Sequence, residues 1–221
     1  MAEEQSSHLV SAAVLVLLFL FSGRHLLAEG QGWLNNSLNL RVDDHFSLII
    51  KSQIRAHNIT FQDPFLYFLE SGFNYKLPKD FYLNTLYRRQ TSKSKDRQVN
   101  ENRYVLETGW KTALKKTFGF DWRFRTEIRT FEQDADANHL CFRLYARLTA
   151  NIKIGELDLK PFVADEPFYD TKRDAFSQNR FYLGSTVPLS DKVEFVISYL
   201  RQDLKGRGTN HILNTGFNLR F

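Results

Sequence analysis

The sequence predicts an all-β protein, an antiparallel transmembrane β-barrel of about 12 strands (10 to 12), preceded by a signal peptide. Three observations carry the prediction. Apolar and polar residues alternate through segments of about ten to thirteen residues, the period of a strand with one apolar face. Short connections alternate with longer polar ones, as in barrels that cross a membrane. The chain closes on an alternating strand that ends at Phe221.

Alternating segments fill the chain from Trp33 onward, where no stretch has helical periodicity. In the sixth segment, for example, Trp122 and Phe124 alternate with Arg123 and Arg125. The predicted strands lie at 33–42, 45–57, 64–76, 81–91, 102–114, 118–131, 139–150, 157–168, 178–187, 192–203 and 210–221. These are eleven segments, whereas single-chain bacterial barrels usually have an even number. We therefore expect twelve strands, with ten as the next choice. A strand missed near the N-terminus, a wrongly assigned strand or an N-terminus threading the lumen would explain the odd count.

Alternation does not by itself say which face points inward, and a soluble barrel would bury its apolar face. The apolar faces here carry Phe, Tyr or Trp on strand after strand, more bulk than a small interior holds. Aromatic residues such as Trp33, Tyr75 and Phe118 also lie near predicted strand ends, where interfacial girdles form. In lipid, every backbone polar group needs a partner within the protein, so only helices or a closed barrel can span. We expect the apolar faces to meet lipid.

The longest apolar run, Leu9 to Phe21, precedes the first predicted strand. Its thirteen residues are fewer than the roughly 20 that a membrane-spanning helix needs, and they suit the core of a signal peptide. Ala28 is a plausible cleavage position, which divides the chain into a signal peptide at 1–28 and a barrel at 29–221. Glu3 and Glu4 stand where a signal peptide normally carries positive charge, and a retained anchoring helix is the alternative.

The last strand resembles the assembly signal that ends bacterial outer-membrane barrels. Its matching residues are Asn214, Gly216, Leu219 and Phe221. The resemblance implies a place in the bacterial outer membrane, and a barrel assembly machinery as a partner during insertion.

The stretch from Pro161 to Gly184 resembles a family of barrels catalogued as domain of unknown function 2490. A strand beginning with Pro reaches Glu166 and Phe168, and after a loop comes Asn-Arg, an aromatic pair, Leu and Gly at 179–184. The early Trp33 strand, the Tyr-Arg-Arg at 87–89 and the closing strand at 211–221 fit as well. The resemblance covers nearly all of the predicted barrel. It implies an outer-membrane barrel of unassigned activity and brings no catalytic residues.

If the apolar faces meet lipid, the alternate residues line the lumen. The lumen-facing cations are Lys51, Arg55, Arg88, Arg103, Lys111, Arg123, Arg125, Arg129, Arg143, Arg147, Lys160, Arg180 and Arg220. The lumen-facing acids are Glu70, Glu107, Asp121, Glu127, Glu166 and Glu194. Thirteen cations against six acids predict a positive interior.

Two functions follow from this interior, and the sequence leaves both open. A positive, narrow lumen favours small anionic solutes such as acidic sugars, which makes the chain a porin-like passive pore. The other interpretation is a structural barrel whose Arg and Glu side chains bond across the lumen and fill it. Arg180 and Glu166, on adjacent strands, are a candidate pair.

An enzyme acting on envelope lipid is the alternative from a different class. It would need a serine and a histidine together on the lipid face near the outer rim. The histidines of the predicted barrel are His45, His57, His139 and His211, and no nucleophile motif adjoins them. We therefore expect no enzyme, no catalytic residue and no cofactor.

Loop composition gives the remaining expectations. The acidic loop with Glu132, Asp134 and Asp136 is predicted to be solvated and not to hold a metal. The run 93–97 is expected outside the cell, near lipopolysaccharide phosphates, with outer-membrane lipid around the barrel. The charge of +5 is spread along the chain, which does not predict a nucleic-acid partner. A single cysteine, Cys141, excludes an internal disulfide.

Overall fold

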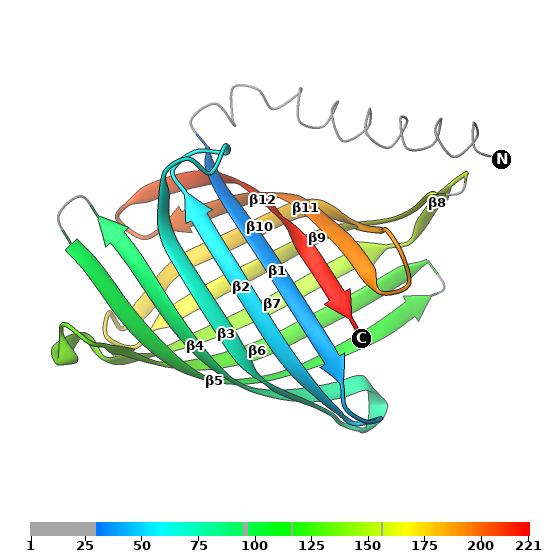
Figure 1. Cartoon of the computed structure of the whole chain (residues 1–221), viewed down its shortest axis with the longest axis horizontal. Helices are drawn as coiled ribbons and strands as arrows, with labels where there is room; N and C mark the ends of the chain where they lie inside the picture. Colours follow the sequence, from blue (N-terminus) through cyan, green and yellow to red (C-terminus); the bar gives the residue numbers. More distant parts are fainter. Residues whose placement is uncertain (1–29, 95–96, 116, 156) are drawn as a thin grey trace.

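A computed structural model describes residues 30–221 except 95–96, 116 and 156. Within them the chain forms one β-sheet that closes on itself as a barrel, with strands steeply inclined to the barrel axis (Figure 1). The predicted signal peptide at 1–28 lies outside the described residues. No helix among the described residues is long and apolar enough to cross a membrane.

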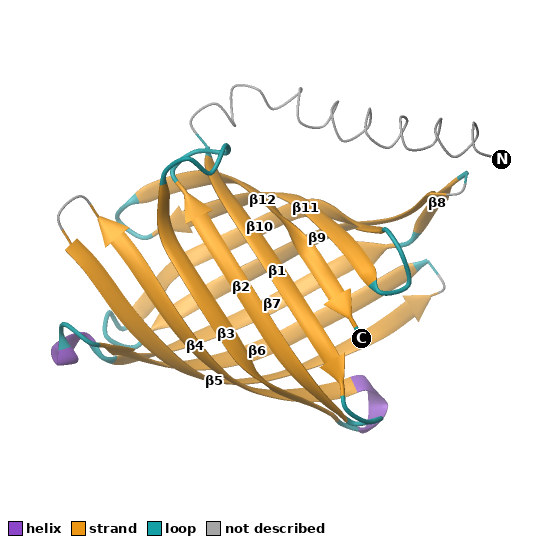
Figure 2. Cartoon of the chain, viewed as in Figure 1, coloured by secondary structure: helices purple, strands orange, loops and turns teal. Residues whose placement is uncertain are grey.

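Twelve strands are present, joined by short turns and loops (Figure 2). Their bounds are β1 (Gln31–Arg41), β2 (Phe46–Ala56), β3 (Pro64–Lys76), β4 (Phe81–Ser94), β5 (Arg97–Lys115), β6 (Phe118–Phe131), β7 (His139–Ala150), β8 (Ile152–Ile154), β9 (Leu157–Asp170), β10 (Ala175–Pro188), β11 (Val193–Leu204) and β12 (Gly208–Arg220). Each of the eleven predicted segments corresponds to one of these strands. The prediction of an all-β barrel is confirmed.

The barrel itself contains eleven strands, because β8 is a three-residue strand that pairs only with β9. An odd number makes the first and last strands run in the same direction. The sheet accordingly closes through a parallel pair, β1 with β12, in register from Gln31 and Ile212 to Asn39 and Arg220. Eleven lies within the predicted range of 10 to 12, although an even number was expected. Two of the proposed explanations concern the N-terminus, and residues 1–29 lie outside the described residues. The odd count is accommodated by the parallel seam between β1 and β12.

Two ends of the barrel can be distinguished by their connections. The loop end carries the connections at 57–63, 95–96, 132–138, 171–174 and 205–207, and the turn end carries those at 42–45, 77–80, 116–117, 151–156 and 189–192. The lengths differ less than predicted, because β4 and β5 extend through most of Thr91–Glu101. The residues of that extension are mainly polar on both faces. The alternation of apolar and polar residues, from which the strands were predicted, therefore covers less of the chain than β4 and β5 do.

Single carboxylates fix short connections at either end. At the turn end, the Asp43 carboxylate accepts backbone hydrogen bonds from His45 and Phe46 at 2.8 and 2.7 Å, which lowers the pKa of Asp43. At the loop end, hydrogen bonding to the Arg89 guanidinium lowers the pKa of Glu132.

The outer surface of the barrel is apolar. Leu69, Tyr104, Leu106 and Leu144 point outward and are about half exposed or more. Glutamate and arginine side chains fill the inside instead, so the faces are inverted relative to a soluble protein. An apolar surface that continues around the whole barrel would associate in water and is covered by lipid in a membrane.

Trp33 does not lie in an interfacial girdle as predicted. It occupies an inward position of β1 and is 2 % exposed. Inside the barrel it packs with Leu200 and Ile212 near the loop end. Its position near the start of a strand suggested the membrane interface, but its alternation with Asn35 and Ser37 places it in the lumen.

The parallel seam is held by side chains as well as by the backbone ladder. The amide of Asn35 donates to Asn214, and the hydroxyl of Ser37 donates to Asn218 at 2.7 Å. Gly216 is the tightest point, because a Cβ there would lie 1.5 Å from the carbonyl oxygen of Asn35. A side chain at Gly216 would therefore push the two strands apart.

We expect Gly216→Ala to impair closure of the barrel, because the new methyl group displaces β1. Heat-dependent migration on a denaturing gel measures the folded fraction, since closed barrels resist detergent until boiled. Gly119→Ala is the matched control, because a Cβ there meets its nearest atom at an ordinary 3.7 Å. Equal folded fractions for the two variants would contradict the role assigned to Gly216.

Candidate functional site in the barrel interior

The interior is divided into two parts along the barrel axis. Toward the loop end, charged side chains fill the lumen and bond to one another. Toward the turn end, the lumen holds a cavity of about 720 Å³. We call the first part the ion-pair network, defined by Glu70, Glu101, Glu107, Glu127 and Glu166 with the arginines that contact them.

Glu127 and Glu166 are the centre of the ion-pair network. Glu127 is 1 % exposed and contacts Arg143 at 2.7 Å, Arg125 at 2.8 Å and Arg103 at 3.2 Å. A buried carboxylate loses its hydration, and several charge-assisted hydrogen bonds are needed to offset that loss. With three guanidinium partners, this one is fully satisfied.

Glu166 continues the network onto the neighbouring strands. It is also 1 % exposed, and it contacts Arg143 at 2.6 Å, Arg123 at 3.4 Å and Arg180 at 3.6 Å. The hydroxyl of Tyr182 donates to it at 3.1 Å. Arg180 lies directly opposite Glu166 in the register of β9 and β10, so the predicted pair does form within this larger cluster.

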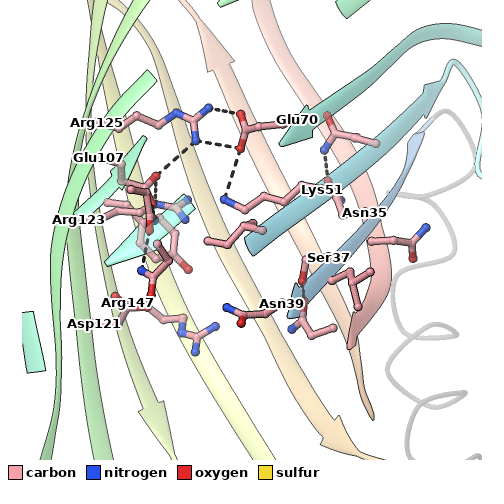
Figure 3. Close-up of a pocket in the computed structure, with 18 of the residues that line it drawn as sticks. Asn35, Ser37, Asn39, Lys51, Glu70, Glu107, Asp121, Arg123, Arg125 and Arg147 are labelled. Atoms are coloured by element: carbon pink, nitrogen blue, oxygen red, sulfur yellow. Dashed lines mark hydrogen bonds and ion pairs between the residues drawn. The ribbon is translucent and has the colours of Figure 1, made fainter. Parts of the chain in front are cut away.

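Glu70 and Glu107 extend the network to β3 and β5, and Figure 3 shows them bonded to Arg125 from opposite sides. Glu70 also contacts Arg88 at 2.7 Å and Lys51 at 3.4 Å. Glu107 accepts a hydrogen bond from Asn84 at 2.7 Å. The network thereby crosses the lumen instead of following one wall.

Several arginines lie directly opposite other arginines on neighbouring strands. Arg125 faces Arg143, and Arg103 faces Arg129, positions at which like charges repel. Glu127 contacts both members of the first pair, and Glu101 contacts both members of the second. The glutamates therefore hold together guanidinium groups that would otherwise separate.

Aromatic rings shield several of the buried cations as well. The guanidinium of Arg55 lies 3.8 Å from the centroid of Trp33, and that of Arg180 lies 4.9 Å from it. Arg88 stacks over Phe68 at 3.7 Å. Such contacts stabilise a desolvated cation without an opposite charge.

The cavity at the turn end is strongly basic. Thirteen Lys or Arg and five Asp or Glu residues line it, an excess of eight positive charges. At the turn end its wall includes Asn39, Lys76 and Asp80, whereas the inward residues nearest the loop end, Gln90, Glu101 and Arg129, do not line it. The cavity is therefore accessible from the turn end and closed by the network on the other side.

Of the nineteen residues predicted to face the lumen, Lys111, Lys160, Glu194 and Arg220 line the cavity, and the other fifteen also lie in the interior. Twelve of these fifteen line the cavity: Lys51, Arg55, Glu70, Arg88, Arg103, Glu107, Asp121, Arg123, Arg125, Arg143, Arg147 and Arg180. The other three, Glu127, Arg129 and Glu166, are in the network. Sequence reasoning missed Glu101, because the predicted strand began at residue 102; its alternation with Arg103 was the available signal.

Three of the histidines of the described chain have identified partners. His211 bonds to the hydroxyl of Tyr199 at 2.6 Å on the outer face, and His57 stacks on Phe65. His139 lies inside, bonded to the carbonyl of Ala137 and 3.6 Å from Asp170. Within the described residues, none of these histidines is hydrogen-bonded to a serine, and no group of three or more His, Cys, Asp and Glu could hold a metal ion.

Comparisons with known proteins agree with the fold. The model of a family described as "Protein of unknown function (DUF2490)" matches residues 30–212, which confirms the predicted resemblance. No curated protein matches significantly. Among solved structures, the β-domain of the Bordetella autotransporter BrkA has a TM-score of 0.50 at 13% identity, over 77% of this chain and 81% of that one.

Two further structures are similar to a lesser degree. LpxR from Salmonella typhimurium has a TM-score of 0.49 at 10% identity, over 79% of this chain and 83% of that one. The siderophore receptor PirA from Pseudomonas aeruginosa has a TM-score of 0.33 at 14% identity, over 79% of this chain and 34% of that one.

We expect Glu127→Gln to destabilise the barrel by about 3–5 kcal/mol, because it leaves three guanidinium groups without their shared carboxylate. Urea unfolding of the protein in lipid vesicles measures the change. Glu132→Gln, at an exposed acid outside the lumen, is the control and should leave stability nearly unchanged, because exposed ion pairs contribute little. Comparable losses in the two variants would show that the buried pairs do not hold the fold.

Proposed function

This chain belongs to the DUF2490 family, and we propose that it is an outer-membrane β-barrel with a structural role, whose lumen is closed by the ion-pair network and attracts anions at the turn end. The observation that carries the proposal is the burial of Glu127 and Glu166, each 1 % exposed in the middle of the lumen. A water-filled channel at this level would leave their carboxylates wet. The eleven-stranded lumen is instead filled by long side chains bonded across it.

Anion preference belongs to the cavity and not to a continuous pore. The excess of positive charge along the cavity wall concentrates anions in the turn-end part of the lumen. A narrow anion-preferring pore is therefore the state that the barrel would reach if the network opened.

The outer surface supports a place in the outer membrane. An apolar belt surrounds the barrel, and near the loop end it gives way to polar groups such as Arg89, bonded to Asn102 at 2.9 Å and to Glu132. In the proposed orientation the loop end faces outward, where these groups meet lipopolysaccharide, and the turn end faces the periplasm. Phe221, exposed at the turn end, completes the signal offered to the barrel assembly machinery.

We expect the purified protein to be silent in planar lipid bilayers. The double variant Arg143→Ala with Glu127→Ala removes one ion pair from the centre of the network, and we expect it to show stepwise, anion-selective conductance, because the remaining wall is basic.

The matched control is Arg89→Ala with Glu132→Ala, which removes an exposed ion pair outside the lumen and should stay silent. Each protein is first shown to be folded by heat-dependent migration. Steady conductance of the unsubstituted protein would contradict the closed lumen.

A further inference from the structure

We propose that the cavity at the turn end is a binding site for a carboxylated saccharide, which enters from that end and is held between a cationic wall and an amide wall. The proposal rests on the proposed function, since it needs a lumen that is closed toward the loop end. It goes beyond that function, because it makes the cavity a specific site instead of a region of positive potential.

The cationic wall is formed by the turn-end halves of β5, β6 and β7. Lys111, Asp121 and Arg147 lie side by side in the registers of these strands, with Arg123 next along β6. Arg123 stacks over Tyr145 at 4.3 Å, and Arg147 lies 5.2 Å over Phe162. Arginines held flat against aromatic rings present their edges, which bind a carboxylate through two parallel hydrogen bonds.

This wall has unused bonding capacity. The Nε atoms of Arg123 and Arg147 and the Oδ1 atom of Asp121 are buried and have no hydrogen-bond partner among the described residues. Nearly all buried polar atoms in proteins are bonded, so three unbonded ones within a single patch need an explanation. In the ion-pair network, by contrast, Glu127 and Glu166 are each bonded to several cations. Buried unbonded atoms also occur elsewhere among the described residues, including Nε of Arg143 in the network, whereas three of them lie together on this wall.

The opposite wall carries amides and hydroxyls and few charges. Figure 3 shows Asn35, Ser37 and Asn39 of β1 across the cavity from Asp121, Arg123 and Arg147. Asn35 and Ser37 bond to partners on β12, which fixes their positions. Asn39 lies on the same wall and is not part of these two bonds. An amide offers a donor and an acceptor together, which matches the hydroxyl groups of a sugar.

Size and charge narrow the class of ligand. The volume of about 720 Å³ is within the range of about 300–1,000 Å³ typical of small-molecule sites. Glu127 and Glu166 bond arginines of the wall, but the positive charge of the wall still exceeds the negative charge, which favours a ligand with more than one carboxylate. A plain inorganic anion would use the cationic wall but leave the amide wall without partners. A short oligomer of a uronic acid satisfies both walls.

Isothermal titration calorimetry on the folded protein in detergent micelles tests the site with four probes: trigalacturonate, maltotriose, citrate and inorganic phosphate. We expect trigalacturonate to bind in a 1:1 ratio and the neutral maltotriose to bind at least about tenfold more weakly, because it lacks the charged groups. Citrate and phosphate should also bind more weakly, because they do not engage the amide wall.

Substitutions in each wall measure the contribution of that wall to ligand affinity. Lys111→Gln with Arg147→Gln should weaken trigalacturonate and citrate together, by about tenfold or more. Asn39→Ala should weaken trigalacturonate several-fold and leave citrate unchanged. Lys153→Gln with Arg207→Gln removes two exposed positive charges outside the cavity and should change neither affinity.

Three results would overturn the proposal. They are no binding of trigalacturonate, equal affinity for trigalacturonate and citrate, or equal effects of the cavity and surface double variants. These outcomes are distinguishable from failure of the proposed function, because closure of the lumen is read from conductance and not from binding.

Discussion

The five glutamates of the ion-pair network are each held by two or more cations, and the rest of the arrangement depends on that pairing. A glutamate removed from water is costly unless its oxygens are bonded, and an unpaired arginine is no better. The lumen contains more arginine than glutamate, and aromatic rings such as Trp33 and Phe168 contact Arg180 and Arg143 in addition to the glutamates. Because polar groups are satisfied inside, the apolar side chains are free to form the outer surface that lipid covers.

The parallel seam gives the second constraint. Eleven strands cannot close by antiparallel pairing throughout, and β1 must meet β12 in the same direction. Asn35 and Ser37 reinforce that contact with side-chain bonds, and Gly216 allows the backbones to approach. The same side chains form the amide wall of the cavity. One row of small polar residues on β1 therefore serves both the closure of the barrel and the chemistry of its interior.

Much of the fold follows from the sequence, because a period of two residues is strong in long strands. The position of each barrel strand and the division into inner and outer faces could be read from alternation around residues such as Trp122 and Arg123. The parallel closure was implied by the count of eleven segments, because an odd number brings the first and last strands together in the same direction, but the usual even number of strands in bacterial barrels outweighed that count. The predicted position of Trp33 in an interfacial girdle was wrong, because the prediction relied on its nearness to a strand end and not on its alternation with Asn35.

The interior was predictable as a set of residues but not as an arrangement. Sequence placed Arg125, Glu127 and Arg143 on inward faces, yet it could not say which carboxylate meets which cation. Those contacts depend on the relative shift of neighbouring strands, which sets Glu127 between two opposed arginines. The separation into a filled half and an open half also follows from that shift. This separation decides whether the lumen is a passage or a closed site.

The central claim is that apolar side chains face the bilayer and charged side chains face the lumen. Quenching of tryptophan fluorescence by brominated lipid tests this claim most directly. In vesicles, a variant that keeps Trp122 as its one tryptophan should be strongly quenched, because this side chain lies on the outer face beside Phe124. A variant that keeps Trp33 alone should be nearly unaffected, because Trp33 is enclosed by Leu200, Ile212 and two arginines. Strong quenching of Trp33 with protection of Trp122 would contradict the account.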